Sequence, residues 1–294
     1  MATVDDAVIL AGGMGTRMLP ASLYIPKETM PLVDTPILNH LIWEAAKAGV
    51  SRIHLVLSQA KKDLLERFLE FGTIHGEEVR VDLPRDSISL GVEGIEIIPH
   101  VQTTPGGVAD AISVAIGNIE GPFLVLLGDM LMLERNNAVQ FSRPSASTAS
   151  LQLVSKFVSS GLPVVGVYPV EISRVSNYGV VELSGEMVSG IVEKPSRKDA
   201  KSNYVLCGRY LLPENTREIL EKYPVSEYGE LQSISLLNHL IENCGLNAVK
   251  LDSMKMYDSG EPMSWLKAQI DHCLSRADMG DEMRKWIIER INQD

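Results

Sequence analysis

The chain has 294 residues, of which 45% are hydrophobic and 22% are charged, a composition typical of a globular protein with a sizeable core. Its formal net charge of −11 at neutral pH argues against a nucleic-acid-binding protein, because such proteins need a basic face. We therefore expect small-molecule partners and no nucleic acid.

Cysteine usage and hydropathy indicate a cytoplasmic protein. The three cysteines, Cys207, Cys244 and Cys273, lie far apart and form no C-x-x-C pair, so we expect neither a disulfide framework nor a zinc site. The first residues lack the basic segment of a secretory leader. No apolar segment approaches the length of a transmembrane helix, so we expect no membrane contact.

Strand-like and helix-like segments alternate through the first half of the chain. We predict strands at residues 7–10, 53–57, 95–99 and 123–127, and helices at residues 37–48, 61–71 and 108–116. Residues 74–94 show little periodicity and are predicted to form an excursion from the sheet. This alternation is typical of βαβ units and predicts an α/β fold of Rossmann-like type, with a mixed, mostly parallel sheet flanked by helices.

The second half of the chain predicts a small mixed-sheet region followed by helices. Strands are expected at residues 164–170, 180–183, 188–192 and 248–251, and helices at residues 215–222, 231–242 and 264–294, with a break near residues 279–280. Residues 143–163 are rich in serine and predict a loop around residues 145–147. Because no long linker interrupts this pattern, we predict a single domain over residues 1–294.

A glycine-rich turn follows the first predicted strand. The string LAGGMGTR covers residues 10–17, so the strand leads directly into three glycines. Glycines let several backbone N–H groups approach an anion, because no side chain blocks the way. Arg17 and Lys27 add positive charge beside the turn, and both side chains bind phosphate oxygens well. The combination predicts a binding site for a nucleoside triphosphate.

Other glycine-rich motifs fit this turn poorly. Residues 12–17 lack the G-x-x-x-x-G-K-[ST] pattern of the Walker P-loop. The dinucleotide fingerprint lacks its third glycine, and the second predicted strand ends in Ser58-Gln59 rather than in an acid that could hold a ribose. An empty strand-to-helix turn would explain two glycines, but neither the third glycine nor the two cations.

Four polar positions allow both a functional and a plain structural interpretation. Asp129 follows the apolar strand at residues 123–127, where a carboxylate can hold Mg²⁺ or cap a turn. Asp258 by itself is typical of an N-cap or turn residue. The Gln102 amide could read the edge of a pyrimidine, although solvated loop glutamines are commoner. Glu193-Lys194 closes a predicted strand, as many solvated ion pairs do.

Several motifs, taken together and in order, resemble the signature of sugar-1-phosphate nucleotidylyltransferases. These motifs are LAGGMGTR (10–17), IPKE (25–28), MPL (30–32), VQTTPGG (101–107), LGD (127–129), YGVVE (178–182), VEKP (192–195) and YDSG (257–260). They cover the chain up to about residue 274. Within this family the chain is most similar to the bacterial uridylyltransferases that act on glucose 1-phosphate, chiefly at residues 17–21 and 25–28.

The resemblance implies an enzyme that transfers a uridylyl group from UTP to glucose 1-phosphate by a Mg²⁺-dependent in-line displacement. It implies catalytic roles for Arg17, Lys27 and Lys194, and metal binding by Asp129 and Asp258. It implies nucleotide contacts from Ala11, Gly12, Gly13, Gly15, Thr16, Glu28, Gln102 and Gly107. It implies sugar contacts from Gly179, Glu193 and Lys194, whereas Arg209 is expected to be structural.

The resemblance also divides the single domain into three parts and suggests an assembly. A nucleotide-binding part would cover residues 1–140, a sugar-binding part residues 141–262, and a C-terminal helical extension residues 263–294. A homodimer or homotetramer is expected. The apolar stripe of residues 286–288 and Ile291 on the last predicted helix is a candidate subunit contact.

Three alternative functions stay open at this point. Glu28 favours the uridylyltransferases, but residues 102–107 look more like the thymidylyltransferases, so a thymidylyltransferase acting on glucose 1-phosphate is the nearest alternative. A homologue that binds sugar nucleotides without catalysis is a second, although the expected charged residues are all present. An NAD(P)-dependent oxidoreductase is a third, and the incomplete dinucleotide motif disfavours it.

Overall fold

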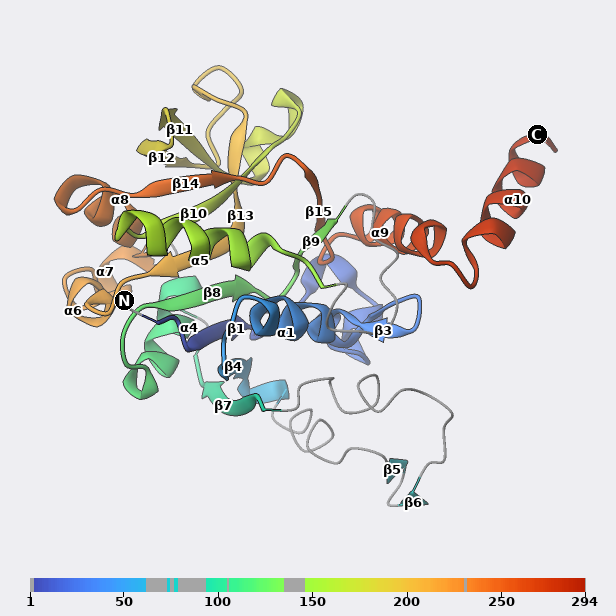
Figure 1. Ribbon diagram of the computed structural model, residues 1–294, viewed down its shortest axis with the longest axis horizontal. Coiled ribbons are helices and arrows are strands. Elements are labelled where there is room, and N and C mark those ends of the chain that lie inside the picture. Colours follow the sequence, from blue (N-terminus) through green and yellow to red (C-terminus); the bar gives the residue numbers. More distant parts are fainter. Residues whose placement is uncertain are drawn as a thin grey trace.

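The computed structural model describes residues 3–61, 73–74, 77–78, 94–104, 106–134, 146–229 and 232–293. Within these residues nine strands form one mixed sheet, in the order β10-β14-β12-β11-β13-β8-β1-β4-β7 (Figure 1). Their bounds are β1 Asp6–Leu10, β4 Arg52–Ser58, β7 Glu96–Gln102, β8 Phe123–Leu127, β10 Val164–Pro169, β11 Gly179–Ser184, β12 Met187–Glu193, β13 Tyr204–Leu212 and β14 Asn247–Lys250. The predicted α/β class with a mixed sheet and flanking helices is confirmed.

The first half of the sheet is parallel and sets the position of the glycine-rich turn. β1 lies between β4 and β8 and pairs with both, and β4 pairs in turn with β7. All four strands match predicted ones, and the central strands β1 and β8 carry continuous apolar runs because helices cover both of their faces. The carboxyl ends of these strands meet at one edge of the sheet, so the turn after β1, Gln102 on β7 and Asp129 after β8 follow one another along that edge.

The second half of the sheet continues the first instead of forming a separate small sheet. β13 pairs antiparallel with β8 on one side and with β10 and β11 on the other. Sequence patterns did not predict β13, because Gly208 and Arg209 interrupt its apolar run. Gly208 has a positive φ of 75°, and a Cβ there would lie 3.0 Å from the Leu127 side chain.

Helices cover both faces of the sheet (Figure 1). α1 (Ile37–Lys47) and α5 (Ala149–Ser160) pack on one face, and α4 (Gly107–Ala115), α6 (Thr216–Glu221) and α8 (Gln232–Asn243) on the other. Sequence patterns did not predict α5, because serines blur its apolar period. In the helix three of these serines, Ser155, Ser159 and Ser160, donate to backbone carbonyls of the preceding turn.

A further layer brings the end of the chain back to the sheet edge. β9 (Met130–Glu134) and β15 (Met254–Asp258) form an antiparallel pair, and α9 (Pro262–Ser275) packs beside them. α10 (Gly280–Ile291) extends away from the rest of the fold (Figure 1). The predicted break near residues 279–280 is confirmed by the boundary between these two helices.

The remaining elements are short. They are the strands β2 Pro31–Leu32, β3 Thr35–Pro36, β5 Thr73–Ile74 and β6 Glu77–Glu78, the helix α7 Val225–Tyr228, and the 3₁₀ turns at Thr16–Met18, Ala21–Leu23, Lys27–Thr29, Gln59–Lys61, Ile116–Asn118 and Ile172–Asn177. The predicted helix over residues 61–71, the excursion over 74–94 and the start of the loop at 145 lie almost wholly outside the described residues. Across the described part of the chain, no helix combines the length and apolarity needed to cross a bilayer.

A buried ion pair joins three elements of this framework. The Arg209 guanidinium on β13 donates to both carboxylate oxygens of Glu44 on α1, at 2.7 and 2.9 Å. Ser150 on α5 donates to the same carboxylate through its hydroxyl at 2.6 Å. Both charged side chains are almost fully buried, so Arg209 has a structural role, as expected.

Removing one partner of this pair should destabilise the fold strongly. Arg209→Met leaves the buried Glu44 carboxylate without a cation, and we expect it to lower the free energy of unfolding by about 3–5 kcal/mol. Glu44→Gln/Arg209→Met removes both charges and should recover much of this loss. Urea denaturation followed by circular dichroism measures both variants. Equal losses in the single and the double variant would contradict this prediction.

Candidate active site

The glycine-rich turn is held between two neighbouring strands. Ala11 N donates to Val56 O at 2.8 Å, and Gly128 N donates to Leu10 O at 2.9 Å. A Cβ on Gly128 would lie only 2.5 Å from Leu10 O, so glycine alone fits there. Gly15 has a φ of 68°, which glycine adopts without strain. The turn is therefore fixed by the backbone of the sheet itself.

Lys27 lies against the inner side of this turn. A Cβ on Gly13 would lie 3.4 Å from Lys27 Nζ, and a Cβ on Gly15 would lie 3.5 Å from Lys27 Cδ. Thr16 begins the 3₁₀ turn Thr16–Met18, which carries Arg17 away from the glycines. Lys27 is 9% exposed and forms an ion pair with Asp129. The lysine side chain therefore packs beside the glycines and reaches Asp129 at the sheet edge.

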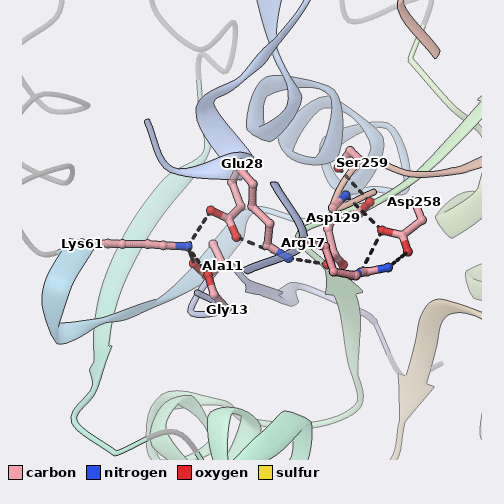
Figure 2. Close-up of polar contacts among 10 residues, drawn as sticks. Ala11, Gly13, Arg17, Glu28, Lys61, Asp129, Asp258 and Ser259 are labelled. Atoms are coloured by element: carbon pink, nitrogen blue, oxygen red, sulfur yellow. Dashed lines mark hydrogen bonds and ion pairs between the residues drawn. The ribbon is translucent and has the colours of Figure 1, made fainter. Parts of the chain in front are cut away.

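Lys61 anchors the turn from the other side, and sequence reasoning missed it. Its ammonium group donates to Ala11 O at 2.8 Å, to Gly13 O at 2.7 Å and to Glu28 Oε2 at 2.7 Å (Figure 2). These three contacts use all three donors of the lysine. Burial lowers the pKa of Lys61, while Glu28 opposes that shift. No local pattern marks Lys61, because its role depends on chain segments that meet only in the fold.

Glu28 is buried beside Lys61 and Lys27. The side chain is 1% exposed, and its Oε1 atom, 3.9 Å from Lys27 Nζ, has no hydrogen-bond partner among the residues described. Burial raises the pKa of this carboxyl, and the two lysines oppose that effect. Glu28 therefore stabilises the cations under the turn. An unpartnered buried oxygen also leaves it an acceptor with spare capacity.

The two aspartates predicted to bind metal come together. Pairing of β9 with β15 sets Asp258 opposite Met130, and Ser259 N and Oγ both donate to Asp129 O at 2.8 Å. A Cβ on Gly260 would lie 3.1 Å from both Asp129 Oδ2 and Asp258 Oδ1. The missing side chain of this glycine lets both carboxylates face one small space (Figure 2).

Cations neutralise these two carboxylates in the free protein. Lys27 pairs with Asp129, and the Arg17 guanidinium donates to Asp258 at 2.7 and 3.2 Å (Figure 2). The hydrogen bond to Asp258 raises the pKa of Arg17. Converging carboxylate oxygens are the ligands that Mg²⁺ prefers, and Mg²⁺ keeps several water or phosphate ligands beside a few protein groups. The donor set fits this ion.

An open cavity of about 640 Å³ lies beside the carboxylates. Its lining is rich in charge of both signs and comprises Arg17, Leu127, Asp129, Met130, Arg174, Ser176, Asn177, Tyr178, Lys194, Asp258 and Glu261. Arg174 and Tyr178 were not singled out from the sequence. Arg174 donates to the Tyr178 hydroxyl at 3.2 Å, and burial raises the pKa of that hydroxyl. A cavity with several cations suits a ligand with phosphate groups.

The predicted sugar-binding residues lie close together, and Lys194 among them lines this cavity. Gly179 and Glu193 are paired across β11 and β12, and a Cβ on Gly179 would lie 3.0 Å from Glu193 Oε2. Lys194 adopts a positive φ of 44°, which is strained for a residue with a side chain, and its N–H donates to Tyr178 O at 3.0 Å. Its ammonium lies 3.4 Å from Glu193 Oε1 and lines the cavity.

The predicted base-reading residues lie at the end of β7. Gln102 is 8% exposed, and its Oε1 lies 3.1 Å from where a Cβ on Gly12 would be. Gly107 opens α4 with a φ of 91°. The sheet edge therefore brings Gln102 next to the glycine-rich turn. Glu28 instead lies with Lys61 and Lys27.

Comparisons with known proteins agree with this geometry. A family model described as nucleotidyl transferase matches residues 6–273. The chain belongs to this family. A Streptococcus pyogenes UTP–glucose-1-phosphate uridylyltransferase is 30% identical, and the alignment covers 98% of this chain and 97% of that relative.

Solved structures of the nucleotidyl transferase family share the fold over most of its length. The UTP-bound UGPase from Acinetobacter baumannii is 27% identical, with a TM-score of 0.81 over 98% of this chain and 99% of that one. A UDP-glucose pyrophosphorylase complexed with UDP-glucose is 26% identical, with a TM-score of 0.75 over 91% of this chain and 97% of that one. The resemblance inferred from motifs is therefore confirmed.

Replacing Lys61 should change the charge state of Glu28. In Lys61→Met the desolvated carboxylate loses its nearest cation, so its pKa rises further above the ordinary value of 4.5. The folded state then binds the proton more tightly than the unfolded state, so stability falls as the pH rises above that value. We expect the melting temperature of the variant to fall below that of wild type by a margin that grows from about pH 5 to about pH 8.

Two further variants control this experiment. Lys61→Met/Glu28→Gln removes the titrating group and should make the margin independent of pH. Lys156→Met breaks another lysine–glutamate contact of 2.7 Å, but on the exposed Glu186, and should show no such trend. A pH-independent margin in Lys61→Met itself would show that Glu28 does not depend on Lys61.

Proposed function

We propose that this protein is a UTP–glucose-1-phosphate uridylyltransferase. It transfers the uridylyl group of UTP to glucose 1-phosphate and produces UDP-glucose and pyrophosphate. Its similarity to UTP–glucose-1-phosphate uridylyltransferases supports this activity, as does its similarity to a UTP-bound UGPase and to a UDP-glucose pyrophosphorylase complexed with UDP-glucose. The observation that carries the proposal is the convergence of Asp129, Asp258 and Arg17 around Gly260 at the cavity, with Lys27 paired to Asp129.

The nucleotide would occupy the glycine-rich turn and the end of β7. Backbone groups of residues 11–16, with the glycines Gly12, Gly13 and Gly15, would meet the phosphates and ribose, because no Cβ blocks the approach. Gln102 and the backbone at Gly107 would read the base. Glu28, for which the resemblance implies a nucleotide contact, would contribute through the two lysines with which it forms ion pairs.

The chemistry needs charge neutralisation and alignment rather than a covalent nucleophile. An oxygen of the sugar phosphate attacks the α-phosphorus, the bond from that phosphorus to the β-bridging oxygen breaks, and pyrophosphate leaves with the electron pair. Arg17 would stabilise the departing phosphates, and Lys27 would bridge the α-phosphate and the attacking group. Lys194 would hold the attacking phosphate, while Glu193 and the open face of Gly179 would accommodate the sugar.

We assign the metal role to Asp129 and Asp258. Mg²⁺ held by these carboxylates would offset the negative charge of both substrates. Lys27 and Arg17 already pair with the same carboxylates in the free protein. Substrate phosphates would replace the carboxylates as partners of these two cations. The same residues thus form ion pairs with one another in the free protein and would bind metal and phosphates when substrates are present.

Three features of the wider protein complete the proposal. The nucleotide-binding part, the sugar-binding part and the C-terminal extension would follow the divisions at residues 140 and 262. The chain would form a homodimer or homotetramer, with exposed Trp286, Ile288 and Ile291 on α10 in the contact. The cysteines are free thiols, two of them buried, which suits the reducing cytoplasm.

A substrate matrix tests the proposed function. UTP, dTTP, CTP and ATP are each combined with glucose 1-phosphate, and pyrophosphate release is measured with Mg²⁺ and with EDTA. We expect UTP to be used best and chelation to abolish turnover. A clear preference for dTTP would favour the thymidylyltransferase alternative, and release that survives EDTA would remove the metal from the proposal.

Loss of Lys27 should slow the reaction itself. Lys27→Ala removes a charge that faces the reacting phosphates, so kcat/KM should fall by about 10²-fold or more. Lys156→Ala, a lysine on the surface far along the chain, should leave the rate unchanged. Turnover of Lys27→Ala close to wild type would exclude Lys27 from the mechanism.

A further inference from the structure

A hydrogen bond fixes which way the Gln102 amide faces. Gln102 Nε2 donates to Asp110 Oδ2 at 2.5 Å, and this bond links the end of β7 to the first turn of α4. The amide oxygen then lies on the opposite side, 3.1 Å from the Cβ position of Gly12. Two separate contacts thus define one orientation, with the acceptor over the glycine-rich turn and the donor turned away from it.

Asp110 is held in place to make this contact. A Cβ on Gly106 would lie 2.6 Å from Asp110 Cγ, so the carboxylate folds back over a glycine that must stay bare. The start of α4 favours a negative charge at this point. A carboxylate carries only acceptors at neutral pH, so it requires the NH₂ group of Gln102 and excludes its oxygen.

The amide orientation decides which bases the turn accepts. Uracil and thymine carry a donor, the N3–H group, at the centre of their pairing edge, whereas cytosine carries an acceptor at N3. A Gln102 oxygen that faces the base accepts a hydrogen bond from N3–H of uracil or thymine, and it repels the acceptor N3 of cytosine. A glutamine without this hydrogen bond could turn its side-chain amide over and bind both kinds of base, because the amide carries an acceptor oxygen on one side and a donor NH₂ group on the other.

We propose that Asp110 is a specificity-determining residue that selects imide bases by locking the Gln102 amide. Asp110 touches no substrate and acts through Gln102, so it is a positioning residue. The inference rests on the proposed function, in which Gln102 faces the base. With this lock, a base site built on an amide would favour UTP over CTP.

The test compares kcat/KM for UTP and CTP in variants of the full chain. Asp110→Ala frees the Gln102 amide to rotate, and the UTP preference should fall by about tenfold or more. The side chain in Asp110→Asn carries both a donor and an acceptor, so it can bind the Gln102 amide in either orientation and should lower the preference less. Ser113→Ala, on the same helix with its hydroxyl bonded to its own helix at Ala109 O, should keep the wild-type ratio.

A reversed pair separates this role from a loss of stability. In Asp110→Asn/Gln102→Glu the amide and the carboxylate exchange places, so the new amide donates to the new carboxylate and an acceptor again faces the base. The UTP preference should return to within about threefold of wild type. A merely structural contact at Asp110 predicts no such recovery.

The outcomes distinguish the inference from the function on which it rests. An unchanged UTP:CTP ratio in both single variants, or no recovery in the reversed pair, overturns the role of Asp110 and leaves the uridylyltransferase intact. Equal use of UTP and CTP by wild type overturns the lock as well. A wild-type protein that turns over neither UTP nor dTTP overturns the proposed function itself. If Asp110→Asn does not fold, Asp110→Ala and the reversed pair decide the question.

Discussion

The site depends on a row of alternating charges held out of water. Lys61, Glu28, Lys27 and Asp129 follow one another, each in contact with the next, and Glu28 and Lys27 are almost fully buried. A buried charge without a partner is very unfavourable, so each member fixes the position of its neighbours. The glycine-rich turn is part of the same arrangement, because two of its carbonyls bind Lys61. The row therefore sets the shape of the site before any substrate arrives.

Two distant strands complete this arrangement from the other end of the chain. β15 pairs with β9 and brings Asp258 beside Asp129, while Arg17 closes the group from the glycine-rich turn. Within the sheet, β13 joins the parallel first half to β11, which in turn pairs with the strand that ends at Glu193. The cavity lies where these connections meet, which is why residues from every third of the chain line it.

Local patterns predicted the parts of the structure that depend on local physics. The parallel strands were visible as apolar runs, and the turn was visible because glycines and cations follow β1 within a few residues. Resemblance to a family, not spacing, suggested that Asp129 and Asp258 act together. Lys61 was missed because its partners are carbonyls and a carboxylate set by tertiary structure. β13 and α5 were missed because Arg209 and several serines look polar in the sequence, yet they find buried or backbone partners in the fold.

The pairing of Lys27 with Asp129 and of Arg17 with Asp258 has a consequence for selectivity among anions. Both cations are already paired with carboxylates in the free protein, so an incoming anion must displace a carboxylate in order to bind either of them. A small anion such as inorganic phosphate replaces one such contact and gains little. A triphosphate can replace several of these contacts at once, and groups that bind beside it can interact with the released carboxylates. The two ion pairs thus favour a triphosphate over inorganic phosphate at these cations.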